Sequence, residues 1–551
     1  MLQEQEAPTE PAVRVPTVYR DPLTWVIAGV VFGAYTAISV FRLLQLDPSS
    51  WDLGIFTEAV KQYAHFHAPI VDVRGPGTNL LGDHFSPAIA VLAPFFRVFP
   101  SAATLLVSQA LLTAASIFPI AQVAWEKLGH GQARAIAIAY GCSWGLQQMI
   151  DFDFHEIAIA VPLLAFALSA LVRGRLRATV LWALPLVLVK EDQGFTVAAI
   201  GIYLVFSGLS ARTVDRSRVR AGMFLTVWGL AWSFLAIAVI IPHFNAAHVY
   251  SYWNAGGAFA PGGTPSAGAV VTQFFHDWPY KLGTVVLLLL PTAFIALRSP
   301  VALIALPSLG LRFESTNSAY WGTDWHYNAT VVPILFVAAV DALALIAASR
   351  ARATAAAPVI AVDAQAAAED PAGSEAGSGS EAGSGSGEAP AGRAAPAGSL
   401  ASAAGWADWA SGASGWWKAT LAGAERYGAA MMLAIAVPLA FQYPLSGLWN
   451  ANTYKISPRA AEANAAMAKV PDGATVLTTL DLLASLAART DTYWIGNAHN
   501  PDTEYIVFDG QDSDYSPPIS NVPSFIASLY PDHMYTQIFS DGPVYVFKRT
   551  G

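Results

Sequence analysis

The chain has 551 residues, of which 54% are hydrophobic and 13% are charged, with a formal net charge of −9. That charged fraction is about half that of an ordinary soluble domain, so the composition predicts an integral membrane protein and excludes a soluble globular one. An acidic chain also lacks the basic face that a nucleic-acid partner requires. The single cysteine, Cys142, lies in an apolar run, which excludes a disulfide framework and a thiolate metal site.

Residues 1–22 are acidic and contain prolines, unlike the basic head of a cleavable signal peptide. We therefore expect a disordered cytoplasmic tail and an uncleaved first span. Apolar stretches near the ~20 residues needed to cross a bilayer recur along the chain. They predict about eleven spans, at 23–44, 102–124, 134–150, 157–172, 176–190, 194–208, 221–241, 282–297, 299–311, 329–348 and 427–443.

Basic residues cluster in alternate connections between these spans, and short cytoplasmic loops carry the excess of Lys and Arg. The strongest clusters are Arg173, Arg175 and Arg177, and then Arg212, Arg216, Arg218 and Arg220. Placing both in the cytoplasm also puts the N-terminus there. This topology requires that Ser86 to Phe99, interrupted by Pro87 and Pro94, lie as a helix on the outer surface instead of crossing.

The C-terminal part changes composition twice. Residues 349–404 are rich in Ala, Gly and Ser, with the repeat EAGSGSEAGSGSGEA, which predicts a disordered cytoplasmic linker. Residues 405–449 contain a Trp-rich interfacial segment and the last span. Residues 450–551 then lie outside the cell.

That outer segment mixes helical and strand-like runs. The helical runs are Arg459 to Lys469 and Leu482 to Ala488, and the strand-like runs are Ala474 to Thr478 and Tyr505 to Phe508. A hairpin is expected at the end, where two β-prone runs flank Asp541-Gly542. The expected fold class is therefore an α-helical polytopic membrane protein, with its transmembrane core at 23–348 and a small C-terminal α/β extracytoplasmic domain.

In this topology the acidic and histidine motifs gather at the outer ends of the spans. The candidates are Asp52, Asp83, His84, Asp151, Asp153, His155, Glu156, Lys190, Glu191, Asp192, Asp324 and His326. Carboxylates at the bilayer interface are costly unless they are paired, hydrated or bound to a metal, so their clustering favours a functional site.

Each motif also has a structural interpretation. Asp52 precedes an amphipathic stretch and would cap that helix. Asp83 and His84 would only satisfy a glycine turn, and Lys190 and Glu191 would neutralise each other. Three other outer-loop histidines, His243, His248 and His276, would simply be solvated.

Two resemblances favour the functional interpretation. An Asp just after the first span and an Asp-x-Asp pair after the third resemble the layout of the GT-C superfamily of membrane glycosyltransferases. The stretches SWDLGIF, NLLGDHFSP, FDFHEIA and LVKEDQG are also similar to a bacterial family of predicted membrane proteins, domain of unknown function 2079, over about 30–345. The GT-C resemblance implies use of a polyprenyl-phosphate-linked sugar on the outer side of the membrane.

Carried over, the GT-C pattern places the catalytic base on Asp52 and a divalent cation, Mg²⁺ or Mn²⁺, on Asp151 and Asp153. The other catalytic candidates are Asp83, His84 and Glu191, and the substrate-binding candidates are His155, Glu156, Lys190, Asp192, Asp324 and His326. A basic residue for the lipid phosphate is expected in a late loop, where Lys281 and Arg312 are available.

We therefore expect an inverting transfer of a sugar from a polyprenyl-phosphate donor to a cell-envelope glycan or protein, at the outer face of the bacterial cytoplasmic membrane. A carboxylate would deprotonate the acceptor hydroxyl while a cation stabilises the departing phosphate. The alternatives are an ion-coupled membrane transporter and a non-catalytic scaffold. A transporter places its charged groups near the middle of the membrane, not at one end of the spans.

Overall fold

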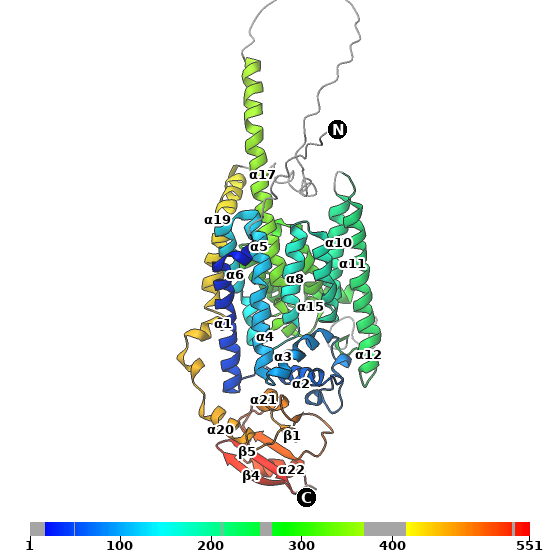
Figure 1. Cartoon of the computed structure of the whole chain (residues 1–551). Coiled ribbons are helices and arrows are strands. Elements are labelled where there is room, and N and C mark those ends of the chain that lie inside the picture. Colours follow the sequence, from blue (N-terminus) through cyan, green and yellow to red (C-terminus); the bar gives the residue numbers. More distant parts are fainter. Residues whose placement is uncertain are drawn as a thin grey trace, which may run out of the picture.

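The computed structural model describes residues 17–48, 50–210, 213–253, 267–368, 415–531 and 535–550. The protein is a mostly helical, multi-span membrane protein with a small sheet domain beyond one end of its helix bundle (Figure 1). The tail at 1–16, the linker at 369–404 and the Trp-rich segment at 405–414 lie outside the described residues.

The helices of the bundle follow the apolar stretches of the sequence. Their bounds are α1 (Pro22–Gln45), α4 (Ala102–Ala115), α5 (Ile117–Leu128), α6 (His130–Gly141), α7 (Trp144–Asp151), α8 (Ile157–Val172), α9 (Leu176–Ala183), α10 (Gln193–Leu209), α11 (Arg216–Leu235), α12 (Ile241–Phe244), α13 (Ala267–Phe275), α14 (Trp278–Leu289), α15 (Leu306–Glu314), α16 (Ser318–Trp321), α17 (Val331–Ala368) and α19 (Gly415–Ala440). Within the described residues, four stretches are long and apolar enough to cross a membrane unaided: Pro22–Gln45, Ala102–Leu128, Arg216–Phe244 and His326–Arg352.

Several predicted spans are interrupted. The span at 134–150 is divided into α6 and α7, because Ser143 between them has an extended backbone. The spans at 282–297 and 299–311 are interrupted more strongly. α14 ends at Leu289, and the chain turns at Ala293 and Phe294, which both have positive φ. Short 3-10 helices, η10 (Ile295–Arg298) and η11 (Pro300–Ala305), then lead into α15. Prolines recur through this stretch and lack the N–H that would continue an α-helix, so the predicted spans at 282–297 and 299–311 are wrong as continuous helices.

The predicted start of the linker, at residue 349, is also too early. α17 continues to Ala368, so residues 349–368 are helical. This stretch is rich in Ala, the residue with the highest helix propensity, and that propensity extends the helix beyond its apolar part.

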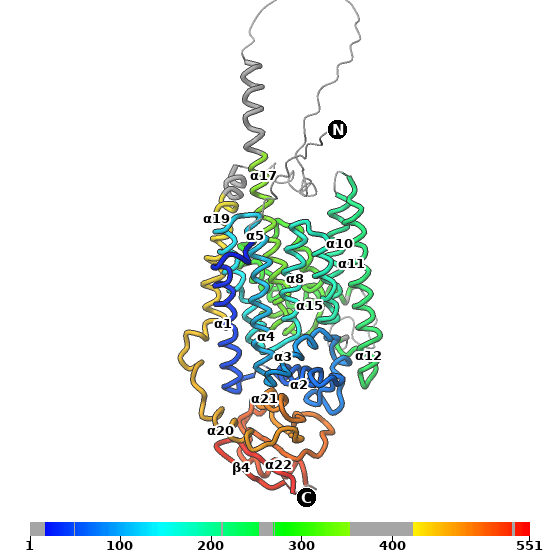
Figure 2. Tube along the Cα trace, in the orientation of Figure 1, coloured from blue at the N-terminus to red at the C-terminus, as the bar shows by residue number. Residues whose placement is uncertain are grey.

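Short helices lie at the end of the bundle that faces the sheet domain (Figures 1 and 2). They are α2 (Asp52–Ala64), the 3-10 helices η2 (Asp72–Arg74), η3 (Leu80–Gly82) and η4 (Pro87–Leu92), and α3 (Ala93–Val98). The stretch Ser86 to Phe99, expected to lie on the surface, forms η4 and α3. Val91, Phe95 and Val98 remain exposed there, as expected of a helix that contacts lipid.

The C-terminal domain is a five-stranded mixed sheet with helices. The strands are β1 (Thr475–Thr478), β2 (Asp491–Trp494), β3 (Tyr505–Asp509), β4 (Tyr535–Asp541) and β5 (Val544–Arg549), and the helices are α20 (Pro458–Met467), α21 (Leu483–Ala487) and α22 (Val522–Leu529). The strand order is β2-β1-β3-β5-β4. β1 pairs in parallel with β2 and β3, and β5 pairs antiparallel with β3 and β4. The predicted hairpin and α/β character are confirmed, whereas β2 and α22 were not predicted.

The sheet domain packs directly on α2. Gly54 lies so close to α21 that a Cβ there would be 3.2 Å from the Leu483 Cβ. The Lys61 Nζ donates a hydrogen bond to the Thr490 carbonyl at 2.6 Å, and the ring centroids of Trp51 and Trp494 are 4.9 Å apart. These contacts place the start of α2 between the bundle and the sheet domain.

Candidate active site

Asp52 is the first residue of α2, and its side chain does not cap that helix. Trp51 occupies the N-cap position without a side-chain bond, and the Ser50 Oγ accepts a hydrogen bond from the Asp52 N–H at 3.1 Å. The Asp52 carboxylate itself has no hydrogen bond and no ion pair within the described part of the chain. The carboxylate is therefore free to accept a proton from a ligand.

Four charged side chains from three other connections interact electrostatically with Asp52: Asp83, His84, Glu156 and Lys190. Burial and the nearby Glu156 carboxylate raise the pKa of Asp52 to about 6, although Lys190 and His84 act in the opposite direction. A carboxylate with such a pKa is ionised at neutral pH, yet it is a stronger base than an ordinary Asp.

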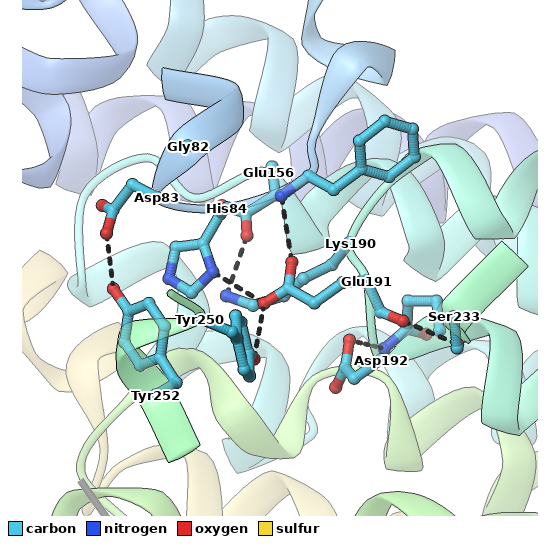
Figure 3. Close-up of polar contacts among 12 residues, drawn as sticks. Gly82, Asp83, His84, Glu156, Lys190, Glu191, Asp192, Ser233, Tyr250 and Tyr252 are labelled. Carbon is cyan, nitrogen blue, oxygen red and sulfur yellow. Dashed lines mark hydrogen bonds and ion pairs between the residues drawn. The ribbon is translucent and has the colours of Figure 1, made fainter. Parts of the chain in front are cut away.

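His84 is held by Glu191, as Figure 3 shows. The His84 Nδ1 lies 2.8 Å from the Glu191 Oε1, and the Phe85 N–H donates to the Glu191 Oε2 at 3.1 Å. The Tyr250 hydroxyl donates to the same Oε1 at 3.1 Å. Burial and Lys190 lower the pKa of His84, but the Glu191 and Asp83 carboxylates together leave that pKa above its usual value. Glu191 thus positions His84 and has little free acceptor capacity for substrate.

Asp83 contacts one residue of its own connection, Arg74, and one far along the chain, Tyr252. Its Oδ2 lies 3.3 Å from the Arg74 Nε, and its Oδ1 accepts a hydrogen bond from the Tyr252 hydroxyl at 3.3 Å. The Tyr252 ring stacks on His84 with a centroid distance of 4.3 Å (Figure 3). The proposal that Asp83 and His84 merely satisfy a local turn is therefore wrong.

Gly82 is required because the end of α12 lies against it. A Cβ at this position would lie 2.5 Å from the Phe244 carbonyl carbon. The Asn245 side-chain amide donates to the Gly82 carbonyl at 2.9 Å. This close approach fixes the Asp83–His84 connection against α12.

Lys190 pairs with Glu156 and not with its neighbour Glu191. The Lys190 Nζ is 2.9 Å from the Glu156 Oε1 (Figure 3). The His155 Nδ1 is 2.8 Å from the Glu156 Oε2. Glu156 is fully buried. Local neutralisation of Lys190 by Glu191 is thus not the arrangement found, and Lys190 is the cation that the fold brings beside Asp52.

The Asp151–Asp153 pair faces a different partner. α7 ends at Asp151, and Asp153 turns the chain with a left-handed φ of 69°, a conformation that Asp tolerates better than most residues. The Arg42 Nη1 lies 2.6 Å from the Asp151 Oδ1, and Arg42 also interacts electrostatically with Asp153. Gln109 fixes this turn, because its side-chain amide donates to the Asp153 carbonyl and its Oε1 accepts from the His155 N–H at 3.1 Å.

No set of three His, Cys, Asp or Glu side chains stands at metal-ligand spacing within the described ranges. A cation at Asp151 and Asp153 would take its remaining ligands from water and from a substrate phosphate, as Mg²⁺ commonly does. The metal site stays a prediction.

Three further candidate residues are either exposed at the surface or in contact with other side chains. Asp324 is exposed and accepts a hydrogen bond from the Thr323 hydroxyl at 3.3 Å. Asp192 accepts from the Gln193 amide at 3.1 Å, close to Lys190. His326 is buried and stacks on His155 at a centroid distance of 3.5 Å.

Neither cation expected in the late loops is free for a phosphate. The Lys281 Nζ donates to the carbonyls of Gln273, Phe274 and Phe313. The Arg312 guanidinium donates to the Tyr320 and Tyr327 carbonyls and to the Asn328 Oδ1. Both side chains therefore form hydrogen bonds within the protein.

Sequence analysis missed several residues around the site, namely Arg42, Arg74, Gln109, Tyr250, Tyr252, Tyr320 and Tyr327. Tyr320 and Tyr327 both interact electrostatically with Asp52 and Lys190. The tyrosines gave no usable signal, because Tyr is common wherever a chain meets the membrane interface.

Comparison with known protein families shows which family contains these motifs. The profile of a family described as predicted membrane proteins (DUF2079) matches residues 42–368, which contain every candidate residue named above. The chain belongs to this DUF2079 family. A search of curated proteins returned no match.

Solved structures relate the DUF2079 protein to a known fold. The crystal structure of ArnT from Cupriavidus metallidurans bound to undecaprenyl phosphate aligns with a TM-score of 0.52 at 14% identity, covering 97% of this chain and 98% of ArnT. Apo ArnT from the same organism aligns at 0.49 and 14% identity, over 96% and 97% of the two chains. The GT-C-like layout expected from the sequence is thus confirmed at the level of the fold.

Proposed function

We propose that this protein transfers a sugar from a polyprenyl-phosphate carrier to a cell-envelope acceptor at the outer face of the bacterial cytoplasmic membrane. The observation that carries the proposal is the unpaired Asp52 carboxylate beside Lys190 and His84, at one end of a helix bundle. The fold shared with ArnT, which was crystallised with undecaprenyl phosphate, supports a lipid phosphate as the ligand class.

The proposed chemistry is a single displacement. Asp52 removes the proton from the acceptor hydroxyl as that oxygen bonds to the anomeric carbon of the sugar. The bond between the anomeric carbon and the phosphate oxygen breaks, and its electron pair leaves with the carrier phosphate, whose charge Lys190 partly neutralises. Attack from the face opposite the leaving group inverts the anomeric centre.

Analysis of envelope glycans tests this proposal against a transporter or scaffold. A strain that lacks the gene should lose a glycan modification, and the wild-type gene should restore it. A gene with Asp52→Asn should not restore it, whereas one with Asp541→Asn should, because Asp541 is an exposed carboxylate at the end of β4, outside the candidate site. Full restoration by Asp52→Asn would favour the scaffold.

The raised pKa of Asp52 predicts the pH profile of transfer. The base acts only when deprotonated, and burial raises its pKa to about 6. We therefore expect kcat/KM to be constant above this pH and to fall about tenfold per pH unit below it. Initial rates between pH 4.5 and 8 measure the profile, and a flat profile down to pH 4.5 would contradict this role of Asp52.

Metal removal tests the role of Asp151 and Asp153. We expect activity to fall in excess chelator and to return with Mg²⁺ or Mn²⁺, since carboxylates suit such hard cations. Asp153→Ala should weaken both the rate and the metal dependence. Full activity in excess chelator would limit these carboxylates to their pairing with Arg42.

Cysteine labelling tests the orientation in the membrane. In a Cys142→Ala background, cysteines at Thr316 and Ser528, which are exposed in the structure, should react on intact cells with an impermeant thiol reagent. A cysteine at Ser210, in the Arg-rich connection between α10 and α11, should react only after the cells are opened. Labelling of Ser210 from outside would reverse the topology.

A further inference from the structure

The buried His326 and Glu156 side chains both interact electrostatically with Lys190. His326 is 3% exposed, and neither of its ring nitrogens has a hydrogen-bond partner within the described part of the chain. The Glu156 Oε1 lies 2.9 Å from the Lys190 Nζ and the Oε2 lies 2.8 Å from the His155 Nδ1, and a carboxylate oxygen can accept more than one hydrogen bond, so both oxygens keep acceptor capacity. Buried polar groups in native proteins are nearly always satisfied, so two unsatisfied ring nitrogens in this group indicate that a ligand completes them.

His155 connects these groups. Its ring stacks on His326 at 3.5 Å between centroids, and its Nδ1 lies 2.8 Å from the Glu156 Oε2. His326 and Glu156 therefore belong to one buried group of side chains, which we call the Glu156–His326 wall, and both interact electrostatically with Lys190.

The rest of this wall is aromatic. The Phe152 and Tyr327 rings lie 4.6 and 4.1 Å from the His326 ring, and the Phe56 ring lies 5.5 Å from His155. A wall of aromatic rings with a few inward polar atoms fits a sugar, which has apolar C–H faces and a rim of hydroxyl groups. Each hydroxyl can donate to a carboxylate oxygen or exchange hydrogen bonds with an imidazole.

We propose that Glu156 and His326 bind the hydroxyl groups of the donor's sugar ring. This inference rests on the proposed function, since it assigns one part of the same site. Lys190 meets the carrier phosphate, and the Glu156–His326 wall distinguishes a sugar-loaded carrier from a bare one.

Binding to the purified full-length protein tests the assignment. The probes are polyprenyl phosphate and its glucosyl, mannosyl and galactosyl phosphodiesters, all with the same chain length. We expect the wild-type protein to bind at least one glycosylated carrier about tenfold more tightly than the bare carrier. His326→Phe keeps an aromatic ring but has no nitrogen, and should remove this preference while leaving the Kd of the bare carrier unchanged.

Two controls separate this role from a folding defect. His326→Gln keeps a donor and an acceptor and should retain part of the preference. His65→Phe changes an exposed histidine outside the cluster and should retain all of it. Unchanged binding of the bare carrier shows that each variant is folded.

Equal binding of all four probes by the wild-type protein would overturn the inference, as would a preference that persists in His326→Phe. These outcomes leave the proposed function standing, since transfer would still be measurable. A clear preference without any transfer would support the sugar-binding wall and contradict the proposed function instead.

Discussion

Replacement of Asp52 by Asn is expected to lower the rate of sugar transfer by about 10²–10⁴-fold, the usual contribution of a general base. The amide cannot accept the proton of the acceptor hydroxyl. The fold should remain intact, because the carboxylate caps no helix and forms no ion pair within the described residues. Asn has almost the same shape, so the local packing should also be preserved.

Transfer rates and thermal unfolding of the same purified variant measure the two effects separately. Asp541→Asn is the matched control, because it makes the same chemical change at an exposed position at the end of β4, outside the candidate site. An Asp52→Asn variant that unfolds at a much lower temperature would indicate a structural role, and one with wild-type activity would remove Asp52 from the mechanism.

Replacement of Lys190 by Met should abolish binding of the lipid phosphate and also destabilise the protein. Lys190 forms an ion pair with Glu156, which is fully buried. Removal of one partner leaves the other charge uncompensated, at a cost of about 3–5 kcal/mol. The loss of binding therefore needs a control that restores the charge balance.

The double variant Lys190→Met/Glu156→Gln supplies that control. It removes both charges with little change in volume and should recover most of the thermal stability lost in the single variant, because a buried ion pair adds little net stability over a neutral pair. Carrier binding and transfer should stay lost, since the cation is still missing. Recovery of transfer in the double variant would reduce Lys190 to a structural partner of Glu156.

Local sequence patterns predicted most of the helices and strands. A run of apolar residues near span length, or a two-residue turn between β-prone runs, depends only on neighbouring residues. β2 escaped prediction because Asp491–Trp494 is short and begins with an exposed, charged residue. It becomes a strand through parallel pairing with β1.

Sequence analysis identified the site residues but not their interaction partners. Sequence analysis predicted that Asp52, His84, Glu156 and Lys190 lie at the same end of the spans, and the fold brings them together. It failed on their partners, because those depend on long-range packing. His84 binds Glu191, 107 residues away, whereas adjacency had favoured a Lys190–Glu191 pair.

Sequence analysis also failed to indicate the proposed phosphate-binding cation, again because the answer depends on long-range packing. Lys281 and Arg312 fitted a late-loop pattern, but each donates to oxygens of its own surroundings. Lys190 carried no such pattern and was identified only by its place beside Asp52 and Glu156. Which charged residue is free for a ligand is a property of the packed structure.

Release of the bare carrier by purified protein is the most direct test of the central claim. The wild-type protein and Asp52→Asn would be placed in liposomes that contain lipid-linked sugars extracted from the native membrane, together with envelope acceptor material. Mass spectrometry would follow free polyprenyl phosphate and the glycosylated acceptor. We predict that both products rise together with the wild-type protein and that neither rises with Asp52→Asn. Equal product formation by the two proteins, or none by the wild-type protein although the carrier binds, would contradict sugar transfer at this site.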